Sequence, residues 1–140
     1  MRGKHVLDLG TGSGVLAMAA ALRGAASVLA VDVDPDAIDA ARESHALNPQ
    51  ASGIEWLVAD FRNRGARPAI ERPWDVVFAN LTGGMLRSSA ARLTELIASG
   101  GLLISSGFDT DERLAVQESL RLEEVAVLVE DTWVGLVLRR

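Results

Sequence analysis

The chain has 140 residues, of which 49% are hydrophobic and 24% charged, a composition typical of one globular domain. It has no cysteine, which excludes disulfide bonds, cysteine nucleophiles and thiolate-bound metal centres. The net charge is −5 without a lysine or arginine stripe, and no apolar run reaches the roughly 18 residues of a membrane span. Because no signal-peptide pattern is visible either, we expect a cytoplasmic protein that binds neither DNA nor a membrane.

Short apolar runs alternate with helix-forming segments along the first half of the chain. Strands are predicted at residues 6–9, 27–33 and 54–59, and helices at residues 15–22 and 35–47. Gly24 stands where a C′ glycine would end the first helix. Asp34 is placed as the N-cap of the second helix, Pro35 takes its first position, and Asn48-Pro49 ends it.

The same alternation continues after a polar connection, residues 62–73, that we expect to be a loop. Strands are predicted at residues 76–79, 102–106, 125–129 and 133–138, and helices from about 86 to 97 and up to about 120. Gly100-Gly101 is expected to end the first of these helices. Asp109 and Glu112 can form a capping box that opens the second.

This order of elements defines the expected fold. Strands that alternate with helices indicate a parallel sheet covered on both faces. The last two strands are separated by too few residues for a helical crossover, so they should pair antiparallel. We therefore predict an α/β, Rossmann-like, doubly wound and mostly parallel seven-stranded sheet whose last strand is antiparallel, in a single domain over residues 1–140.

The segment DLGTGSG at 8–14 joins the first strand to the first helix. A glycine-rich turn at this place points backbone N–H groups at a ligand, and a Cβ there would block close approach. The alternative is a tight turn without a ligand. The spacing differs from the dinucleotide fingerprint, because Val15 occupies the position of its third glycine, and this argues against a pyrophosphate-binding dehydrogenase.

Polar residues also follow the next three strands. Asp32 ends the second strand, 22 residues after Gly10, where its carboxylate can accept both hydroxyls of a ribose. Asp60 follows the third strand and can accept a hydrogen bond from an exocyclic amine such as that of adenine, with Phe61 as an apolar edge; the alternative is a surface turn. Asn80 ends the fourth strand, at the usual ligand edge of a parallel sheet, and the alternative is again a turn residue.

Three of these segments, DLGTGSG at 8–14, VDVDP at 31–35 and AD at 59–60, resemble in order and spacing the class I S-adenosylmethionine-dependent methyltransferases. The resemblance covers nearly the whole chain. The later segments VFANL at 77–81, GGLLISSGF at 100–108 and DTWVGLVL at 131–138 are similar to the catalytic domain of the PrmA family, which methylates amino groups of a large-subunit ribosomal protein.

The resemblance implies S-adenosylmethionine as the cofactor and assigns a role to each matching position. The glycine loop would hold the methionine part with Asp8 near its ammonium, Asp32 would hold the ribose hydroxyls and Asp60 the adenine amine. Asn80 and the carbonyl of Leu81 would face the methyl group and orient the incoming amine. The candidate cofactor-binding residues are Asp8, Gly10, Thr11, Gly12, Gly14, Asp32, Val33, Asp60, Phe61 and Asn80; the candidate catalytic residues are Asn80 and Leu81; no metal ligand is expected.

Little further chemistry is required of the protein. The sulfonium is already an activated methyl donor, so the protein supplies alignment and desolvation. No dedicated general base is visible: His5 and His45 are expected to be structural. After Asn80 the chain continues Leu81-Thr82 rather than with the N-P-P-aromatic run of many nucleic-acid base methyltransferases, which makes an exocyclic base amine a weaker choice of acceptor.

The sequence therefore favours methyl transfer from S-adenosylmethionine to an amine of a protein, such as a ribosomal protein. A methyltransferase for a small molecule or RNA is the second reading, and a cofactor-binding domain without catalysis is the third. The family has a substrate-recognition domain and a cover helix ahead of the glycine loop, and we expect this chain to lack both. It is then a catalytic-domain fragment, a minimal enzyme or a remnant. No feature of the sequence assigns an oligomeric state.

Overall fold

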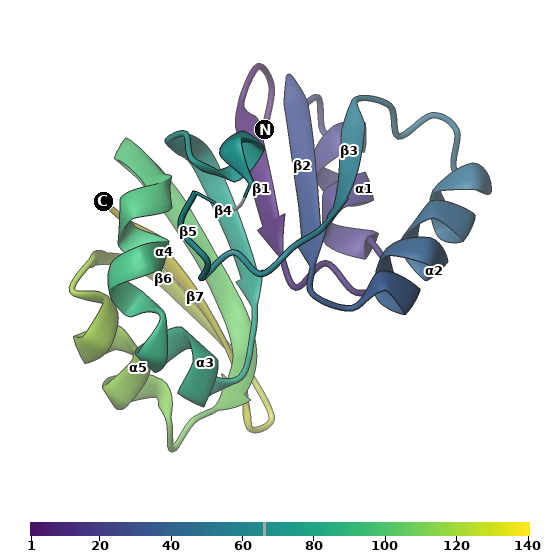
Figure 1. The fold of residues 1–140 in the computed structure, drawn as a ribbon. Helices are drawn as coiled ribbons and strands as arrows, with labels where there is room; N and C mark the ends of the chain where they lie inside the picture. The colour runs from purple at the N-terminus through teal and green to yellow at the C-terminus, as the bar shows by residue number, and fades with distance from the viewer. Residues whose placement is uncertain (66) are drawn as a thin grey trace. The chain divides into compact units, whose positions relative to one another are not determined.

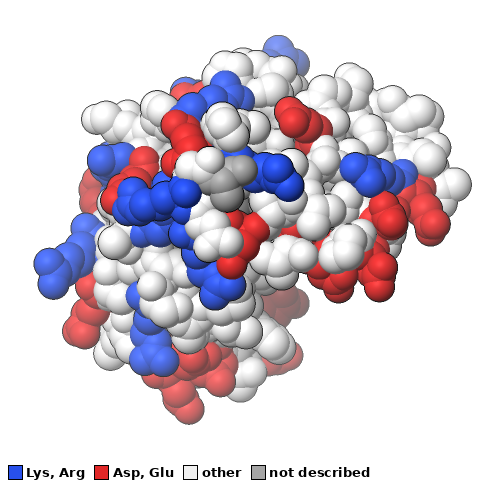
Figure 2. Space-filling view, viewed as in Figure 1, with Lys and Arg blue, Asp and Glu red and all other residues white. Residues whose placement is uncertain are grey.

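The computed structural model describes residues 1–65 and 67–140, which form two compact units, Met1–Arg72 and Pro73–Arg140. We refer to them as unit 1 and unit 2. Both units combine strands with helices (Figure 1). On the face drawn in Figure 2, Lys and Arg side chains lie among Asp and Glu side chains. No helix in the described part of the chain is long and apolar enough to cross a membrane.

Unit 1 has three parallel strands in the order β3-β2-β1, with two helices packed on them (Figure 1). Its elements are β1 (His5–Leu9), α1 (Val15–Leu22), β2 (Ser27–Asp32), α2 (Pro35–Ala46) and β3 (Ile54–Val58), followed by the short 3₁₀ helix η1 (Pro68–Ile70). The apolar residues of β1 and β2 are almost completely buried, as expected for parallel strands that are covered by helices. These two strands form the core that supports the loop between β1 and α1.

The ends of both helices in unit 1 follow the predicted signals. Gly24 has a φ of +84°, the left-handed conformation of a residue that follows a helix C-cap. The Asp34 carboxylate accepts a hydrogen bond from the backbone N–H of Asp36 at 2.9 Å, and Pro35 begins α2. The Asn48 side-chain amide donates to the carbonyl of Ser44 at 2.8 Å, beside the helix C-terminus. The predicted N-cap and both predicted helix ends are therefore confirmed.

Unit 2 has four strands in the order β4-β5-β7-β6, and its helices pack against one another and against β5 (Figure 1). Its elements are β4 (Trp74–Asn80), α3 (Gly83–Ser88), α4 (Ala90–Leu96), β5 (Ile97–Asp109), α5 (Arg113–Leu120), β6 (Glu123–Glu130) and β7 (Trp133–Arg139). β4 and β5 are parallel, whereas β7 is antiparallel to both β5 and β6. The predicted terminal hairpin is therefore confirmed.

The predicted helix from 86 to 97 is wrong in extent. It begins earlier, at Gly83, where the Thr82 hydroxyl accepts a hydrogen bond from the N–H of Met85 at 3.3 Å. It is divided at Ser89, which is buried and has φ −105° and ψ 7°. The second part ends at Leu96, and β5 starts at once, so the two glycines at 100 and 101 lie inside an irregular strand rather than after a helix.

The predicted capping box forms only in part, and α5 begins four residues after Asp109. The Asp109 carboxylate accepts hydrogen bonds from the backbone N–H groups of Asp111 and Glu112, at 3.1 and 3.3 Å, and so closes a turn ahead of the helix. Glu112 is itself the N-cap residue and its side chain makes no capping hydrogen bond. The predicted loop at 62–73 holds η1, whose Ile70 is buried; Ala66 of this loop lies outside the described residues.

Replacing Asp34 by Ala should lower the free energy of unfolding by about 1 kcal/mol, because the N–H of Asp36 loses its acceptor at the start of α2. Chemical denaturation measures this change. Asp39→Ala is the matched control, since the Asp39 carboxylate makes an exposed ion pair with Arg42 on the same helix and should matter by less than about 0.5 kcal/mol. Equal losses in the two variants would contradict the capping role.

Candidate functional site

The glycine-rich loop of unit 1 is held against the carboxyl end of β2. The backbone N–H groups of Gly10 and Thr11 both donate to the carbonyl of Val31, at 2.9 and 3.1 Å. The N–H of Gly12 donates to the carboxylate of Asp32 at 3.0 Å. Hydrogen bonds to one neighbouring strand therefore fix the path of the loop.

Two glycines of this loop differ in what surrounds them. Gly14 has a φ of +81°, and a Cβ on it would lie 2.6 Å from the indole ring of Trp56. Gly12 has a φ of +53°, and a Cβ on it would meet nothing within 4 Å. Both conformations favour glycine, but only the backbone of Gly12 borders open space that a ligand can enter. Gly14 is needed for packing, and Gly12 leaves room for a ligand.

Asp8 is a fully buried carboxyl group next to this loop. Its Oδ2 accepts a hydrogen bond from the Thr11 hydroxyl at 2.7 Å, whereas Oδ1 has no hydrogen-bond partner among the described residues. Burial raises the pKa of Asp8 from 3.8 to about 6; the Thr11 hydroxyl and the Ala17 amide lower this pKa, and the charge of Asp32 raises it. The Ala17 amide thus affects the pKa of Asp8, but it makes no hydrogen bond to Oδ1. A buried oxygen without a donor points to a ligand that supplies one.

Asp32 lies at the end of β2 and uses both carboxylate oxygens in the free protein. Oδ2 accepts from the N–H of Gly12 at 3.0 Å, and Oδ1 accepts from the N–H of Asp34 at 3.1 Å. Each oxygen keeps a further lone pair, because a carboxylate oxygen can accept two hydrogen bonds. Val33 follows and is 56% exposed, so its side chain is accessible from solvent. The carboxylate is thus fixed in orientation and still able to accept donors from a ligand.

Asp60 follows β3 as predicted, and its carboxylate is already bound by the side chain of Arg62, two residues further along the chain. Oδ1 accepts from the backbone N–H and the Nε of Arg62, at 3.0 and 2.8 Å, and Oδ2 accepts from Nη2 of the same guanidinium at 2.7 Å. The hydrogen bonds from the Arg62 side chain are the main reason that the pKa of Asp60 lies below its usual value. Phe61 is only 4% exposed and offers little apolar edge to a ligand.

The two histidines each connect secondary-structure elements. His5 Nδ1 lies 2.8 Å from the hydroxyl of Ser27, between β1 and β2. His45 Nε2 lies 2.6 Å from the carbonyl of Ala51, and its Nδ1 accepts a hydrogen bond from the indole of Trp56 at 3.3 Å. These contacts agree with the structural roles predicted for both. No group of three or more potential metal ligands occurs in the part of the chain that the structure describes.

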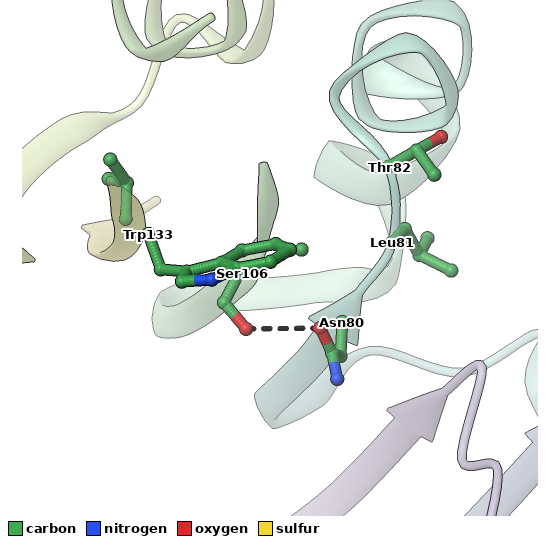
Figure 3. Close-up of a pocket in the computed structure, with 7 residues that line it drawn as sticks. Asn80, Leu81, Thr82, Ser106 and Trp133 are labelled. Carbon is green, nitrogen blue, oxygen red and sulfur yellow. Dashed lines mark hydrogen bonds between the residues drawn. The ribbon is translucent and has the colours of Figure 1, made fainter. Parts of the chain in front are cut away.

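Unit 2 contains a pocket of about 500 Å³ at the end of β4 (Figure 3). The lining residues are Asn80, Leu81, Thr82, Ser106, Gly107, Trp133 and Val134. The Ser106 hydroxyl donates a hydrogen bond to Oδ1 of Asn80 at 3.1 Å, and the side chain of Trp133 is 63% exposed. None of these described lining residues is charged, so the pocket offers oxygen acceptors for the N–H groups of a ligand beside an apolar indole.

A β-bulge shapes one side of this pocket. Ser105 pairs with Leu136 and Phe108 with Val134, so Ser106 and Gly107 together oppose a single residue of β7. Gly107 has a φ of +99°. A Cβ on it would lie 2.6 Å from the carbonyl oxygen of Leu81 and 3.0 Å from Oδ1 of Asn80. The bulge therefore brings a residue without a side chain next to two hydrogen-bond acceptors.

Five lining residues were not among the candidates from the sequence: Thr82, Ser106, Gly107, Trp133 and Val134. Ser106 ends the predicted fifth strand and Gly107 follows it, where a ligand edge is expected. Trp133 begins β7, and because β7 runs antiparallel to β5, its first residue lies at the edge where β4 and β5 end. The predicted hairpin together with this edge rule would have identified Trp133.

The glycine-rich turn after β1, the acidic residue at the end of β2 and the antiparallel last strand define a class I S-adenosylmethionine-dependent methyltransferase fold. The α/β, Rossmann-like fold predicted from the sequence is thereby confirmed. Within this class, the chain belongs to the ribosomal protein L11 methyltransferase (PrmA) family, whose model matches residues 1–140.

Relatives and a solved structure support this assignment. Proteins named ribosomal protein L11 methyltransferase from Pelobacter propionicus and Chloroflexus aurantiacus are 36% and 38% identical, over 96% and 99% of this chain. The crystal structure of a ribosomal protein L11 methylase from Lactobacillus delbrueckii subsp. bulgaricus matches all of this chain with a TM-score of 0.89 and 28% identity, over 71% of that protein. The chain spans 43% and 49% of the two curated relatives, less than half of their length.

The raised pKa of Asp8 predicts a pH-dependent cost to stability. A carboxyl whose pKa rises on folding binds its proton more tightly in the folded state, so stability is lost as the pH rises from about 4 to above 6. Asp8→Asn removes this cost and should be more stable than the wild type by up to about 3 kcal/mol at pH 7.5. The advantage should shrink at pH 4, as measured by urea unfolding of both proteins. A difference that does not change with pH would contradict the assignment.

Proposed function

We propose that this chain transfers a methyl group from S-adenosylmethionine to an amino group of a protein, and that ribosomal protein L11, which the relatives' names specify, is the acceptor. The observation that carries the proposal is the unsatisfied Oδ1 of buried Asp8 beside the glycine-rich loop. Family membership supports the choice of cofactor and acceptor. The compartment we propose is the cytoplasm, because a ribosomal protein would meet the enzyme there.

The residues of unit 1 fit the methionine and ribose parts of the cofactor. An ammonium group would donate to Oδ1 of Asp8, and its positive charge would favour the ionised carboxylate in spite of burial. Thr11 holds the other oxygen of that carboxylate in place. The open space at Gly12 would receive the part of the cofactor that approaches the backbone, with Gly10 and Gly14 shaping the loop around it.

The outer end of the cofactor would lie against the polar ends of β2 and β3. The free lone pairs of Asp32 would accept the ribose hydroxyls, and the exposed side chain of Val33 would contact the base. Oδ2 of Asp60 accepts one hydrogen bond from Arg62 and keeps a lone pair for the adenine amine, so the two donors would share it. Phe61 is buried and would anchor this turn by packing rather than by stacking on the base.

The acceptor amine would bind in the pocket of unit 2. When bound, the cofactor supplies a methyl group already activated by the sulfonium. The amine must be neutral, because its lone pair forms the new bond to carbon. Oδ1 of Asn80 and the carbonyl oxygen of Leu81 would accept its N–H groups and fix the direction of the lone pair. The surroundings of the pocket favour the neutral amine, since the described lining residues include no carboxylate to stabilise the ammonium.

The test of this function has two stages. Calorimetric titration of S-adenosylmethionine into the purified chain measures cofactor binding, and mass spectrometry of ribosomal protein L11 after incubation measures methyl transfer. Binding followed by methylation supports the proposal. Binding with transfer only to RNA or to a small amine would support the second reading, and binding without any transfer a cofactor-binding domain. A folded chain that does not bind the cofactor would overturn the proposal.

Asp32→Ala should weaken S-adenosylmethionine binding by about 1.5–3 kcal/mol, the range for hydrogen bonds to a charged group. Calorimetry measures the loss, and a melting temperature recorded on the same sample separates it from unfolding. Asp36→Ala is the matched control, because Asp36 is an exposed acidic residue in the first turn of α2. Among the described residues, its side chain makes no hydrogen bond to the glycine-rich loop. Unchanged affinity in folded Asp32→Ala would remove the ribose role.

Asn80→Ala should leave cofactor affinity nearly unchanged and reduce the single-turnover rate of methylation by about a hundredfold, the effect expected when a reacting group is misaligned. A structural Asn80 predicts the opposite pattern, with a lower melting temperature and an unchanged rate per folded molecule. The three quantities are measured on one preparation. A full rate in this variant would remove Asn80 from the catalytic residues.

A further inference from the structure

The bulge in β5 places Ser106 and Gly107, two residues with different effects on the pocket, at neighbouring positions. In a regular strand Ser106 and Gly107 would each lie opposite a different residue of β7. Here both lie opposite the single residue between Val134 and Leu136. The extra residue bends the strand and changes the direction of its side chains. Bulges of this kind are frequent next to active sites. Both residues line the pocket that contains Asn80 (Figure 3).

Ser106 fixes the amide group of Asn80. The two residues are directly opposite each other on the parallel strands β4 and β5, and the Ser106 hydroxyl donates to Oδ1 of Asn80 at 3.1 Å. Oδ1 keeps one further lone pair after accepting this hydrogen bond. The hydrogen bond restricts rotation about the last side-chain bond of Asn80. Ser106 thus holds the amide group in place at the edge of the pocket.

Gly107 keeps open the space in front of two acceptors. The position that its Cβ would take lies 2.6 Å from the carbonyl oxygen of Leu81 and 3.0 Å from Oδ1 of Asn80, so both oxygens converge on the same small region. The carbonyl cannot move away easily, because the N–H of Leu81 donates to the carbonyl of Ser106 at 3.0 Å. Any side chain at residue 107 would therefore cover an acceptor.

We propose that the Ser106–Gly107 bulge positions the methyl acceptor at the two oxygens that lie at the end of β4. An N–H group of a neutral amine can donate to either of these converging oxygens, and the lone pair of the nitrogen is left for the reaction. Ser106 acts through Asn80 and Gly107 through the space it leaves, so both are positioning residues. The inference rests on the proposed function, since it specifies the acceptor group of that same pocket.

A pair of glycine variants tests the role of Gly107. Gly107 and Gly100 both lie in β5 with positive φ, +99° and +74°, but a Cβ on Gly100 would meet nothing within 4 Å. Both Ala variants should lose stability through backbone strain. Only Gly107→Ala should also lower kcat/KM for the protein acceptor, by at least about tenfold, with unchanged affinity for S-adenosylmethionine. Equal kcat/KM values in the two variants would overturn the proposal.

Two Ser106 variants test the role of the hydroxyl. Ser106→Ala should reduce the methylation rate and Ser106→Thr should restore it, because threonine keeps the hydroxyl and fits a strand. A rate that falls equally in both variants would overturn the positioning role.

A measurement without turnover keeps the inference separate from the proposed function. Ethylamine is titrated into ¹⁵N-labelled protein at a pH where part of it is neutral, and the side-chain amide resonance of Asn80 is followed. The resonance should shift in the wild type and in Gly100→Ala, and remain unchanged in Gly107→Ala. If this pattern is seen in a protein that methylates nothing, the proposed function fails and the amine pocket stands. If the wild-type resonance does not respond, the amine pocket fails even in an active enzyme.

Discussion

Two backbone hydrogen bonds to a single carbonyl, that of Val31, determine where the glycine-rich loop of unit 1 lies. With Gly10 and Thr11 anchored there, the N–H of Gly12 reaches Asp32, and the hydroxyl of Thr11 reaches the carboxyl buried below. The loop, the end of β2 and the carboxyl of β1 therefore form one hydrogen-bonded group. A substitution in one member of this group therefore removes a hydrogen bond that another member makes.

Unit 2 also gathers polar groups at the ends of its strands, but different structural features place them there. Its pocket depends on a strand irregularity and on a reversal of chain direction, rather than on a loop that precedes a helix. The bulge in β5 supplies a hydroxyl and an uncovered backbone, and the antiparallel course of β7 supplies an indole. In both units the polar groups come from the carboxyl ends of parallel strands, where the backbone is free of the sheet's hydrogen bonding and can change direction.

The sequence was informative where a signal is local. The N-cap at Asp34, the C′ glycine at Gly24 and the terminal hairpin each depend on a few adjacent residues, and each was predicted correctly. The division of a helix at buried Ser89 and the bulge in β5 could not be predicted, because they follow from packing and register between distant segments. Asp60 shows a different limit: its carboxylate and Arg62 are only two residues apart, but this spacing alone does not predict that they bind each other.

The buried carboxyl of β1 would also connect the supply of the proposed cofactor to the lifetime of the protein. Near neutral pH a charge at this position destabilises the folded chain until a cation neutralises it. A ligand that binds only the folded state raises its stability by mass action, in proportion to the logarithm of ligand concentration. With the cofactor bound as proposed, a cell short of methyl donor would hold a larger unfolded fraction of this protein, open to proteases. The abundance of the enzyme would then follow the supply of its own donor without any dedicated regulator.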